Sequence, residues 1–495
     1  MTVFYASIFL IISALLTGLA QQPLHLGWLS WFSLVPVLFI LNRLESLKDF
    51  VKAGFIWGVT YSFTVIFWLA MNIGTTPLIG LISMLAAVLY ASLNCTIICL
   101  IMGMLKSRYS QIWFWFLPFV WTTIEYIRNM DLQTGGPWTA LANTQLDFLT
   151  LVQNAEVTGI YGITFWLILL NVSIFNWIDS PFPEYLFAAV SIFILPWLTG
   201  ILLTPLPSSD NGNNLDIAVV QPNIHLSQKW KPGGARANIE SLLTLSQPAI
   251  KQETDVIIWP ESATSSYILQ GNQNNLKWIQ SKLGNSKLLS GIPYYTGNKH
   301  NRMFYNSAVL ISADSVSKPY NKLMLVPMAE HIPLSGFFPS LKKLNLGQAN
   351  FTHGKDYKIF NVDNTHIAAM ICFESTIPSL SAEFVRLGAQ VLVYVVNDGW
   401  YEHPPEPQQH AKQAIYRAVE NRRPVVRCAN TGISMIIEPS GNITQQLPLN
   451  SEGVMSGTII PSNRATFYTQ YGDIFAQLSG LISVILILGI FIRKK

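Results

Sequence analysis

Charged side chains are scarce in this sequence. Asp, Glu, Lys and Arg make up only 12% of the 495 residues, while 50% are hydrophobic. An ordinary soluble domain carries roughly a quarter charged residues, so this composition excludes a wholly soluble protein and is typical of a membrane protein. The formal net charge of +4 is small for this length, and no basic stripe is present. Binding to nucleic acid is therefore not expected.

Cysteine is also rare, and the common metal and nucleotide motifs are missing. Four cysteines in a chain of this length do not make a disulfide framework. The sequence has no Cys-x-x-Cys or His-x-x-x-His spacing, so it predicts no metal site. It also lacks a G-x-x-x-x-G-K-S/T loop for a nucleotide. We therefore expect a protein that works without a cofactor.

Hydrophobic runs, by contrast, fill the first 204 residues. Seven runs come close to the length of about 20 residues that crosses a bilayer, namely Val3–Leu19, Leu24–Leu41, Ala53–Met71, Leu78–Met104, Ile112–Ile127, Ile160–Trp177 and Tyr185–Leu203. The run Ile112–Ile127 is short and contains Pro118, so a re-entrant or interfacial segment is the alternative there. Another run, Ile474–Ile492, lies near the C-terminus.

The positions of basic residues predict how these runs are oriented across the membrane. They follow the second run, the fourth run and the last run, as Arg43, Lys48 and Lys52, then Lys106 and Arg108, then Arg493, Lys494 and Lys495. Basic loops stay on the cytoplasmic side of a membrane. The sequence therefore predicts a transmembrane domain at 1–204, a periplasmic domain at 205–472, and a C-terminal transmembrane helix with a basic cytoplasmic tail at 473–495.

The predicted periplasmic half alternates between strands and helices. Short apolar runs indicate buried strands at Leu215–Gln221, Asp255–Trp259, Lys287–Gly291, Ser307–Ser312, His366–Ile371, Val391–Val396 and Val425–Ala429. Helical patterns lie between them, at Asn238–Ile250, Leu276–Lys282, Ser379–Leu387 and Gln408–Asn421. Such alternation predicts an α/β domain whose sheet is covered by helices.

Three reactive side chains stand beside these strands. Cys372 follows one apolar run directly, Glu261 follows another after a proline, and Lys322 precedes a third. Acyl transfer through a thiol needs this set of groups, because a carboxylate takes the thiol proton, a thiolate attacks the carbonyl and a cation stabilises the oxyanion. Each residue alone has an ordinary alternative, namely a core cysteine, a helix cap and a surface charge.

The motifs around these residues resemble the nitrilase superfamily. They are Trp259-Pro-Glu-Ser, Asn321-Lys-Leu, Glu330-His-Ile-Pro and Ile371-Cys-Phe-Glu-Ser, followed by Asn397-Asp-Gly-Trp-Tyr, Gln409-His and Asn430-Thr-Gly. With the hydrophobic runs, the chain is similar to the apolipoprotein N-acyltransferase family of that superfamily. The resemblance implies a multi-pass helical membrane domain joined to a nitrilase-like α–β–β–α sandwich. It also implies that Glu261 is the base, Lys322 the oxyanion stabiliser and Cys372 the nucleophile.

The resemblance extends to four supporting residues. Glu330 and Glu374 match further carboxylates of the family, which position the lysine and the incoming amine, although satisfied structural acids are the alternative. Trp230 matches a tryptophan near the family's site, where an ordinary edge or membrane-belt aromatic is the alternative. Phe373 stands where a tyrosine is expected, so a hydrogen bond from that side chain is in doubt but a packing role is not. Phe337 and Phe338 fit either a lid that dips into lipid or simple packing.

The family implies an acyl transfer in the bacterial inner membrane. The donor would be a phospholipid such as phosphatidylethanolamine, and the acceptor the N-terminal diacylglyceryl-cysteine of an apolipoprotein. The reaction would proceed by a ping-pong mechanism through a thioester on Cys372, in a monomer. The alternatives are a membrane-tethered amidase or nitrile hydrolase that uses water, and a transporter with a folded external domain. The transporter is disfavoured because the hydrophobic runs hold few charges.

Overall fold

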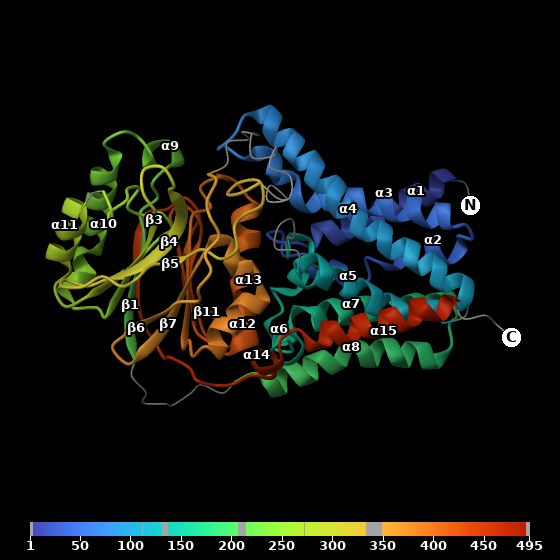
Figure 1. Cartoon of the computed structure of the whole chain (residues 1–495). Coiled ribbons are helices and arrows are strands. Elements are labelled where there is room, and N and C mark those ends of the chain that lie inside the picture. Colours follow the sequence, from blue (N-terminus) through green and yellow to red (C-terminus); the bar gives the residue numbers. More distant parts are fainter. Residues whose placement is uncertain are drawn as a thin grey trace.

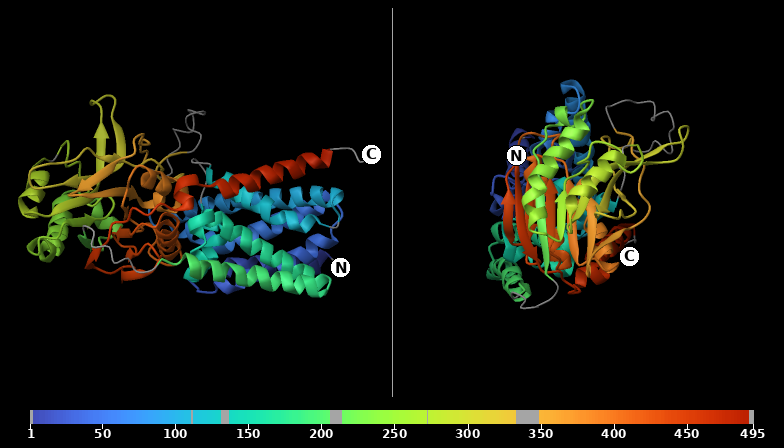
Figure 2. Two further views of the ribbon diagram at one scale, coloured as in Figure 1. Left: turned by 90° about the horizontal axis from the view of Figure 1, so that it is seen from below. Right: turned by 90° about the vertical axis from the view of Figure 1, so that its left-hand side faces the viewer.

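A bundle of helices and a two-sheet sandwich form the two halves of the chain (Figure 1). The computed structural model describes residues 3–110, 112–130, 137–205, 214–271, 273–332 and 349–491. The first and the last helix of this part of the chain both belong to the bundle, and the sandwich is built from the residues between α8 and α15 (Figures 1 and 2). The sandwich is therefore attached to the bundle at both of its ends.

The bundle holds the hydrophobic runs. Within the described residues, five helical segments are long and apolar enough to cross a membrane: α3 Leu47–Ile66 with its extension to Met71, α4 Pro77–Arg108, α7 Ala155–Asp179, α8 Pro183–Leu203 and α15 Ile474–Phe491. The shorter helices of the bundle are α1 Val3–Leu19, α2 Val35–Arg43, α5 Leu117–Met130 and α6 Leu149–Val152. Helices of this length and apolar composition are typical of a membrane domain.

Two predicted runs are divided in the structure. The run Leu24–Leu41 becomes a 3₁₀ turn, Gly27–Trp31, followed by the nine-residue helix α2, and the run Ile112–Ile127 becomes a 3₁₀ turn, Trp113–Phe116, followed by α5. Pro36 and Pro118 lie in the first turns of these helices, where the missing N–H of proline is tolerated. The number of membrane crossings and the three domain limits stay predictions, and the basic tail at 493–495 lies outside the described residues.

Two six-stranded sheets form the sandwich. The first has the order β12-β1-β2-β3-β4-β5, with bounds Gly453–Ile459, Leu215–Gln221, Val256–Trp259, Lys287–Thr296, Met303–Ile311 and Tyr320–Asn321. The second has the order β11-β10-β9-β8-β7-β6, with bounds Ile443–Leu447, Ser434–Ile437, Val425–Ala429, Val391–Val396, Thr365–Ile371 and Ile359–Val362. The central strands β1-β2-β3 and β7-β8-β9 run parallel, and their flanking strands pair antiparallel.

Alternating side chains divide the sandwich into four layers. In β1, Ile217 and Val219 join the core between the two sheets, while Ala218 and Val220 pack on the outer side. The helices α10 Gly234–Lys251 and α11 Gln273–Leu283 cover that outer side, and α12 Pro378–Arg386 and α13 Glu406–Asn421 cover the second sheet. This alternation is the period of two that strands buried on both faces require. The layering confirms the predicted α–β–β–α sandwich (Figure 1).

The helix α13 lies between the second sheet and the bundle (Figure 1). Fourteen of its 16 residues are buried. Its polar side chains contact the bundle directly, since the Tyr416 hydroxyl donates to the Ala142 carbonyl at 2.6 Å and the Trp68 indole donates to Gln409 at 3.1 Å. The two halves are therefore joined by specific hydrogen bonds as well as by apolar packing.

Candidate active site

Cys372 lies at a sharp turn directly after β7. Its φ of +52° places it in the left-handed region, which a residue with a side chain rarely adopts. The residue opens a 3₁₀ turn, Cys372–Thr376, so the chain changes direction at the thiol. The thiol is free of any disulfide, and Cys372 is only partly buried while Phe373 and Glu374 beside it are buried. Strained backbone of this kind is common at active sites, where the turn can orient a reactive side chain.

Glu261 enters the site from β2 after Pro260. The backbone here packs closely on β3, because a Cβ added at Gly291 would lie 2.6 Å from the Glu261 Cα. The carboxylate is buried, and its Oε1 accepts a hydrogen bond from the Asn306 amide at 2.5 Å. Burial raises the pKa of Glu261 above its usual 4.5, although Lys322 opposes that shift. A carboxyl group with a raised pKa is suited to take and return a proton near neutral pH.

Lys322 follows the short edge strand β5 and is 1% exposed. Its ammonium nitrogen lies 2.8 Å from Oε2 of Glu330 and 3.8 Å from Oε1 of Glu261. Burial works to lower the pKa of Lys322, but the two carboxylates outweigh it and raise the pKa overall. The residue is therefore a permanent buried cation beside two acids.

The Cys372 thiol shares this electrostatic environment. Burial raises its pKa well above the ordinary value, and the charge of Glu261 raises it further, while Lys322 works in the opposite direction. The resting group is thus a thiol that needs a base before it can attack. Glu261, Lys322 and Glu330 form one buried cluster, and the partly buried Cys372 thiol lies within its electrostatic influence. The catalytic roles of these residues stay predictions.

Glu374 connects the cysteine turn to the lysine segment. Its carboxylate accepts four hydrogen bonds, from the Tyr320 hydroxyl at 2.7 Å and from the backbone nitrogens of Leu323 at 2.7 Å, Met324 at 3.0 Å and Ile371 at 2.7 Å. Burial raises its pKa to about 7 despite these donors. All four contacts are internal, which favours the structural alternative for this residue over a role in binding the amine.

Two residues that the sequence did not single out complete the cluster. The Asn306 amide nitrogen reaches both acids, Glu261 at 2.5 Å and Glu330 at 3.0 Å. The buried ammonium of Lys229 donates to the backbone carbonyl of Glu261 at 2.8 Å, and burial lowers its pKa to about 8. Asn306 could have been found in the sequence as a polar residue within an apolar strand. Lys229 could not, because its burial depends on the tertiary fold.

A second network supports the cysteine turn from behind. Its Asp398 and His410 stand in motifs of the family resemblance, but no role is predicted for them from the sequence. Nε2 of His410 lies 3.2 Å from the Cys372 carbonyl and 3.0 Å from the Ser375 hydroxyl. Nδ1 of His410 lies 2.8 Å from Asp398, whose other oxygen accepts from Arg427 at 2.7 Å. Trp138 of the bundle packs edge-on against the imidazole. This chain of contacts links the bundle to the backbone of the nucleophile.

Three side chains around the cysteine turn carry donor atoms that a metal ion could use. The donor atoms of Cys372, Asp398 and His410 lie within 4.8 Å of one another. Asp398 is, however, already held by both Arg427 and His410. A fixed guanidinium beside the carboxylate opposes a second cation there. The arrangement therefore fits a hydrogen-bonded support better than a metal centre.

The two aromatic residues predicted for the site, Trp230 and Phe373, lie in different surroundings. Trp230 is 52% exposed at the end of the short helix α9 Leu226–Lys229, next to the lysine that contacts Glu261. Phe373 is buried and lines a cavity of about 440 Å³ between the cysteine turn, α12 and the ends of α5 and α15. The site therefore lies where the sandwich meets the bundle. The roles of both residues stay predictions, and Phe337 and Phe338 lie outside the described residues.

Known proteins share this combination of parts. Residues 13–173 match the family described as apolipoprotein N-acyltransferase N-terminal domain, and residues 216–467 match the carbon-nitrogen hydrolase family. The fold and the cluster thus define a carbon–nitrogen hydrolase domain carried on a membrane domain. Two relatives named apolipoprotein N-acyltransferase are those of Geobacter metallireducens, 30% identical over 94% of this chain and 91% of the relative, and of Chlorobaculum tepidum, 28% identical over 98% and 96%. The chain belongs to the apolipoprotein N-acyltransferase family and is an acyltransferase.

Two solved structures are similar to about half of this chain. An amidase from Nesterenkonia sp. AN1 is 16% identical, with a TM-score of 0.40 over 54% of this chain and 99% of the amidase. Nit3 of Saccharomyces cerevisiae, a member of the nitrilase superfamily, is 17% identical, with a TM-score of 0.38 over 50% of this chain and 89% of its own.

Proposed function

We propose that this enzyme transfers a fatty acyl chain from a membrane phospholipid to the N-terminal amine of the diacylglyceryl-cysteine of an apolipoprotein. The observation that carries the proposal is the cluster of Glu261, Lys322 and the partly buried Cys372, whose turn is linked to the bundle through His410 and Trp138. A reactive thiol linked to the bundle in this way can meet an ester carbonyl without removing the lipid from the membrane. The family and the apolar helices support the same substrate class.

In the first half-reaction, Glu261 takes the proton of the Cys372 thiol. The thiolate then attacks the ester carbonyl, and Lys322 with the backbone N–H after Cys372 stabilises the oxyanion. When the tetrahedral intermediate collapses, the C–O bond of the ester breaks and Glu261 protonates the leaving alkoxide. A lysophospholipid leaves, and the acyl group remains on the sulfur as a thioester.

In the second half-reaction, the amine of the apolipoprotein attacks the thioester. Glu261 takes a proton from the attacking amine, and the same two donors hold the new oxyanion. The C–S bond then breaks, an amide forms and the proton returns to the sulfur. Each half-reaction thus leaves the enzyme ready for the other, as ping-pong chemistry requires.

The finer assignments belong to the same proposal. Phosphatidylethanolamine is proposed as the donor, and the enzyme acts as a monomer in the bacterial inner membrane. The sandwich, at 205–472, faces the periplasm between a membrane domain at 1–204 and the last membrane helix. A thioester on Cys372 can form only if this thiol is free of a disulfide in the periplasm. All four cysteines are unpaired in the structure.

Intact mass of the full-length protein tests the thioester. After incubation in phosphatidylethanolamine nanodiscs, the wild type should gain one acyl group that hydroxylamine removes, and Cys372→Ala should gain none. Cys428→Ala is the matched control, because Cys428 is fully buried in the core and should leave the adduct intact. A diacylated lipopeptide should then discharge the adduct to an amide. Free fatty acid without amide would indicate that water is the acceptor, and no adduct with a free thiol would reject the proposal.

A further inference from the structure

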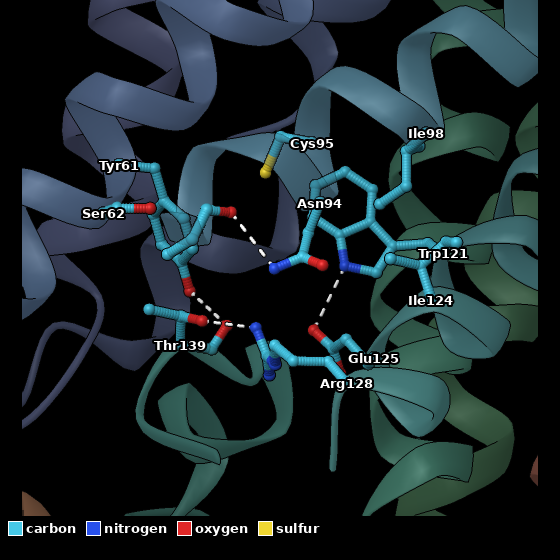
Figure 3. A pocket seen from close by; sticks show the side chains of 11 residues that line it. Tyr61, Ser62, Asn94, Cys95, Ile98, Trp121, Ile124, Glu125, Arg128 and Thr139 are labelled. Atoms are coloured by element: carbon cyan, nitrogen blue, oxygen red, sulfur yellow. Dashed lines mark hydrogen bonds between the residues drawn. The ribbon is translucent and has the colours of Figure 1, made fainter. Parts of the chain in front are cut away.

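The bundle contains a buried arginine whose charge has no counter-charge in contact within the part of the chain that the structure describes. Arg128 lies in the last turn of α5 and is 9% exposed. Its Nη1 donates to the Thr139 hydroxyl at 2.5 Å, whereas Nε and Nη2 have no hydrogen-bond partner among the described residues (Figure 3). A guanidinium remains charged inside a protein, and a buried charge without a partner is costly. Two of its nitrogens are therefore available to an external acceptor.

Glu125, one turn earlier, does not fill this role. Its Oε1 accepts from the Trp121 indole and from the Leu141 backbone nitrogen, both at 3.1 Å, and its Oε2 accepts from the Thr164 hydroxyl at 2.8 Å. Within the described residues no ion pair joins Glu125 to Arg128. Figure 3 shows the acid turned toward the indole and the arginine turned toward Thr139.

Arg128 borders a small cavity between α3, α4 and α5. Its lining includes Tyr61, Asn94, Ile124 and Arg128 (Figure 3). Ala91 also lines the cavity. Its volume of about 10 Å³ accommodates a single oxygen atom. Asn94, Ala91 and Ile124 are only partly buried, so the cavity reaches the outer surface of the bundle.

That surface is apolar and lies at the end of the bundle nearest the active site. Leu93 and Ile127 beside the cavity are 50% and 55% exposed, as lipid-facing side chains are. Two residues before Arg128, the Tyr126 hydroxyl accepts from Gln477 in the first turn of α15 at 3.2 Å. Arg128 therefore lies at the level where α15 begins, which is the level of lipid headgroups if α15 crosses the membrane.

We propose that Arg128 binds the phosphate of a membrane phospholipid, with one phosphate oxygen inside this cavity and the rest of the headgroup at its mouth. This inference rests on the proposed use of phospholipid at the neighbouring active site. Guanidinium groups match phosphate oxygens in charge and geometry. Thr139 follows Trp138, which packs against His410 behind Cys372, so the phosphate site is connected to the cysteine turn through a short series of contacts.

Competition between two lipids tests the site. Full-length protein in nanodiscs of phosphatidylethanolamine and phosphate-free monogalactosyl diacylglycerol is examined by native mass spectrometry, and the ratio of the two retained lipids is measured. The wild type should prefer phosphatidylethanolamine, and Arg128→Gln should reduce this preference roughly tenfold, as the loss of a charged hydrogen bond does. Arg108→Gln, which removes an arginine at the far end of α4, is the control and should keep the preference.

A second variant and a competition with inorganic phosphate complete the test. If Arg128→Gln does not fold, Ala91→Leu fills the cavity without touching the arginine and should remove the preference in the same way. An unchanged ratio in either folded variant would show that the cavity holds water only. Displacement of the lipid by inorganic phosphate would assign the site to a free ion and overturn the lipid assignment.

The ratio is independent of acyl transfer, so the two proposals can fail separately. It can be measured in the Cys372→Ala background, where no thioester forms. A wild type that forms the thioester while Arg128→Gln keeps the lipid ratio would retain the function and reject the phosphate site. A wild type that never forms the thioester while Arg128→Gln changes the ratio would retain the phosphate site and reject the function.

Discussion

Lys322 forms its close ion pair with Glu330 and not with Glu261. The ammonium nitrogen lies 2.8 Å from the Glu330 carboxylate and 3.8 Å from that of Glu261. Glu330 thus takes the strongest contact of the cation, and Glu261 keeps an oxygen that is not committed to a salt bridge. Glu330 can therefore hold the lysine while the Glu261 carboxylate remains available to accept a proton.

The first prediction concerns Glu330→Gln. Without the Glu330 carboxylate, Lys322 should turn to Glu261, lower the pKa of Glu261 and make it a poorer base. The single-turnover rate of acyl-enzyme formation should fall by about tenfold or more, since base catalysis contributes roughly 10²–10⁴-fold. Glu438→Gln, at an exposed glutamate, is the control. An unchanged rate would show that Glu330 does not direct the lysine.

The second prediction concerns pH. Because the pKa of Glu261 is raised, the rate of acyl-enzyme formation should fall with decreasing pH already above pH 4.5, the ordinary value, as the base becomes protonated. The Asn306 hydrogen bond favours the carboxylate form, so Asn306→Ala should move this acidic limb to higher pH. Asn285→Ala, which loses an exposed contact with Glu253, should leave the pH–rate profile unchanged. A limb that stays in place in Asn306→Ala would contradict the assignment of Glu261 as the base.

The third prediction concerns His410, a positioning residue. His410→Ala removes the contact behind the Cys372 carbonyl, and the left-handed turn at the thiol should loosen. We expect a lower kcat with little change in the KM for phospholipid, and partial recovery in His410→Gln, whose amide can still donate to that carbonyl. His403→Ala, at an exposed histidine, is the control. Equal losses in the Ala and Gln variants would argue against a role through this hydrogen bond.

The fourth prediction concerns the stability that Glu374 provides. In Glu374→Gln, an amide N–H replaces an oxygen that accepts from a backbone donor, so one buried donor loses its partner. The free energy of unfolding should fall by about 1–3 kcal/mol. Glu383→Gln on α12 loses only an exposed ion pair with Arg386 and should change little. Equal thermal stabilities of the two variants would contradict this account.

The central strands could be predicted from the sequence because they are uninterrupted apolar runs. The bounds of β1, β8 and β9 agree with the predicted ones, since these strands are buried on both faces. The edge strands were missed for the opposite reason. β5 has only two residues, and β11 is exposed along most of its length, so neither has an apolar run.

Part of the site could also be predicted from the sequence. Glu261, Lys322 and Cys372 stand at the ends of recognisable strands, and their neighbourhood follows from the sandwich. Asp398, His410 and Arg427 act through contacts between the segment after β8, α13 and β9, which only the tertiary structure brings together. Arg128 carried no signal in the sequence, because a buried guanidinium with two nitrogens that lack a partner among the described residues is recognised only when its surroundings are known.

The burial of α13 has a practical consequence for anyone who wishes to work with the sandwich alone. Fourteen of its 16 residues are covered, and Gln409 and Tyr416 direct polar groups into the bundle. A fragment cut at residues 205 and 472 would leave this face in water, with its indole and carbonyl partners gone. Such a fragment should aggregate or lose the turn at Cys372, so this enzyme is best purified and engineered as an undivided chain.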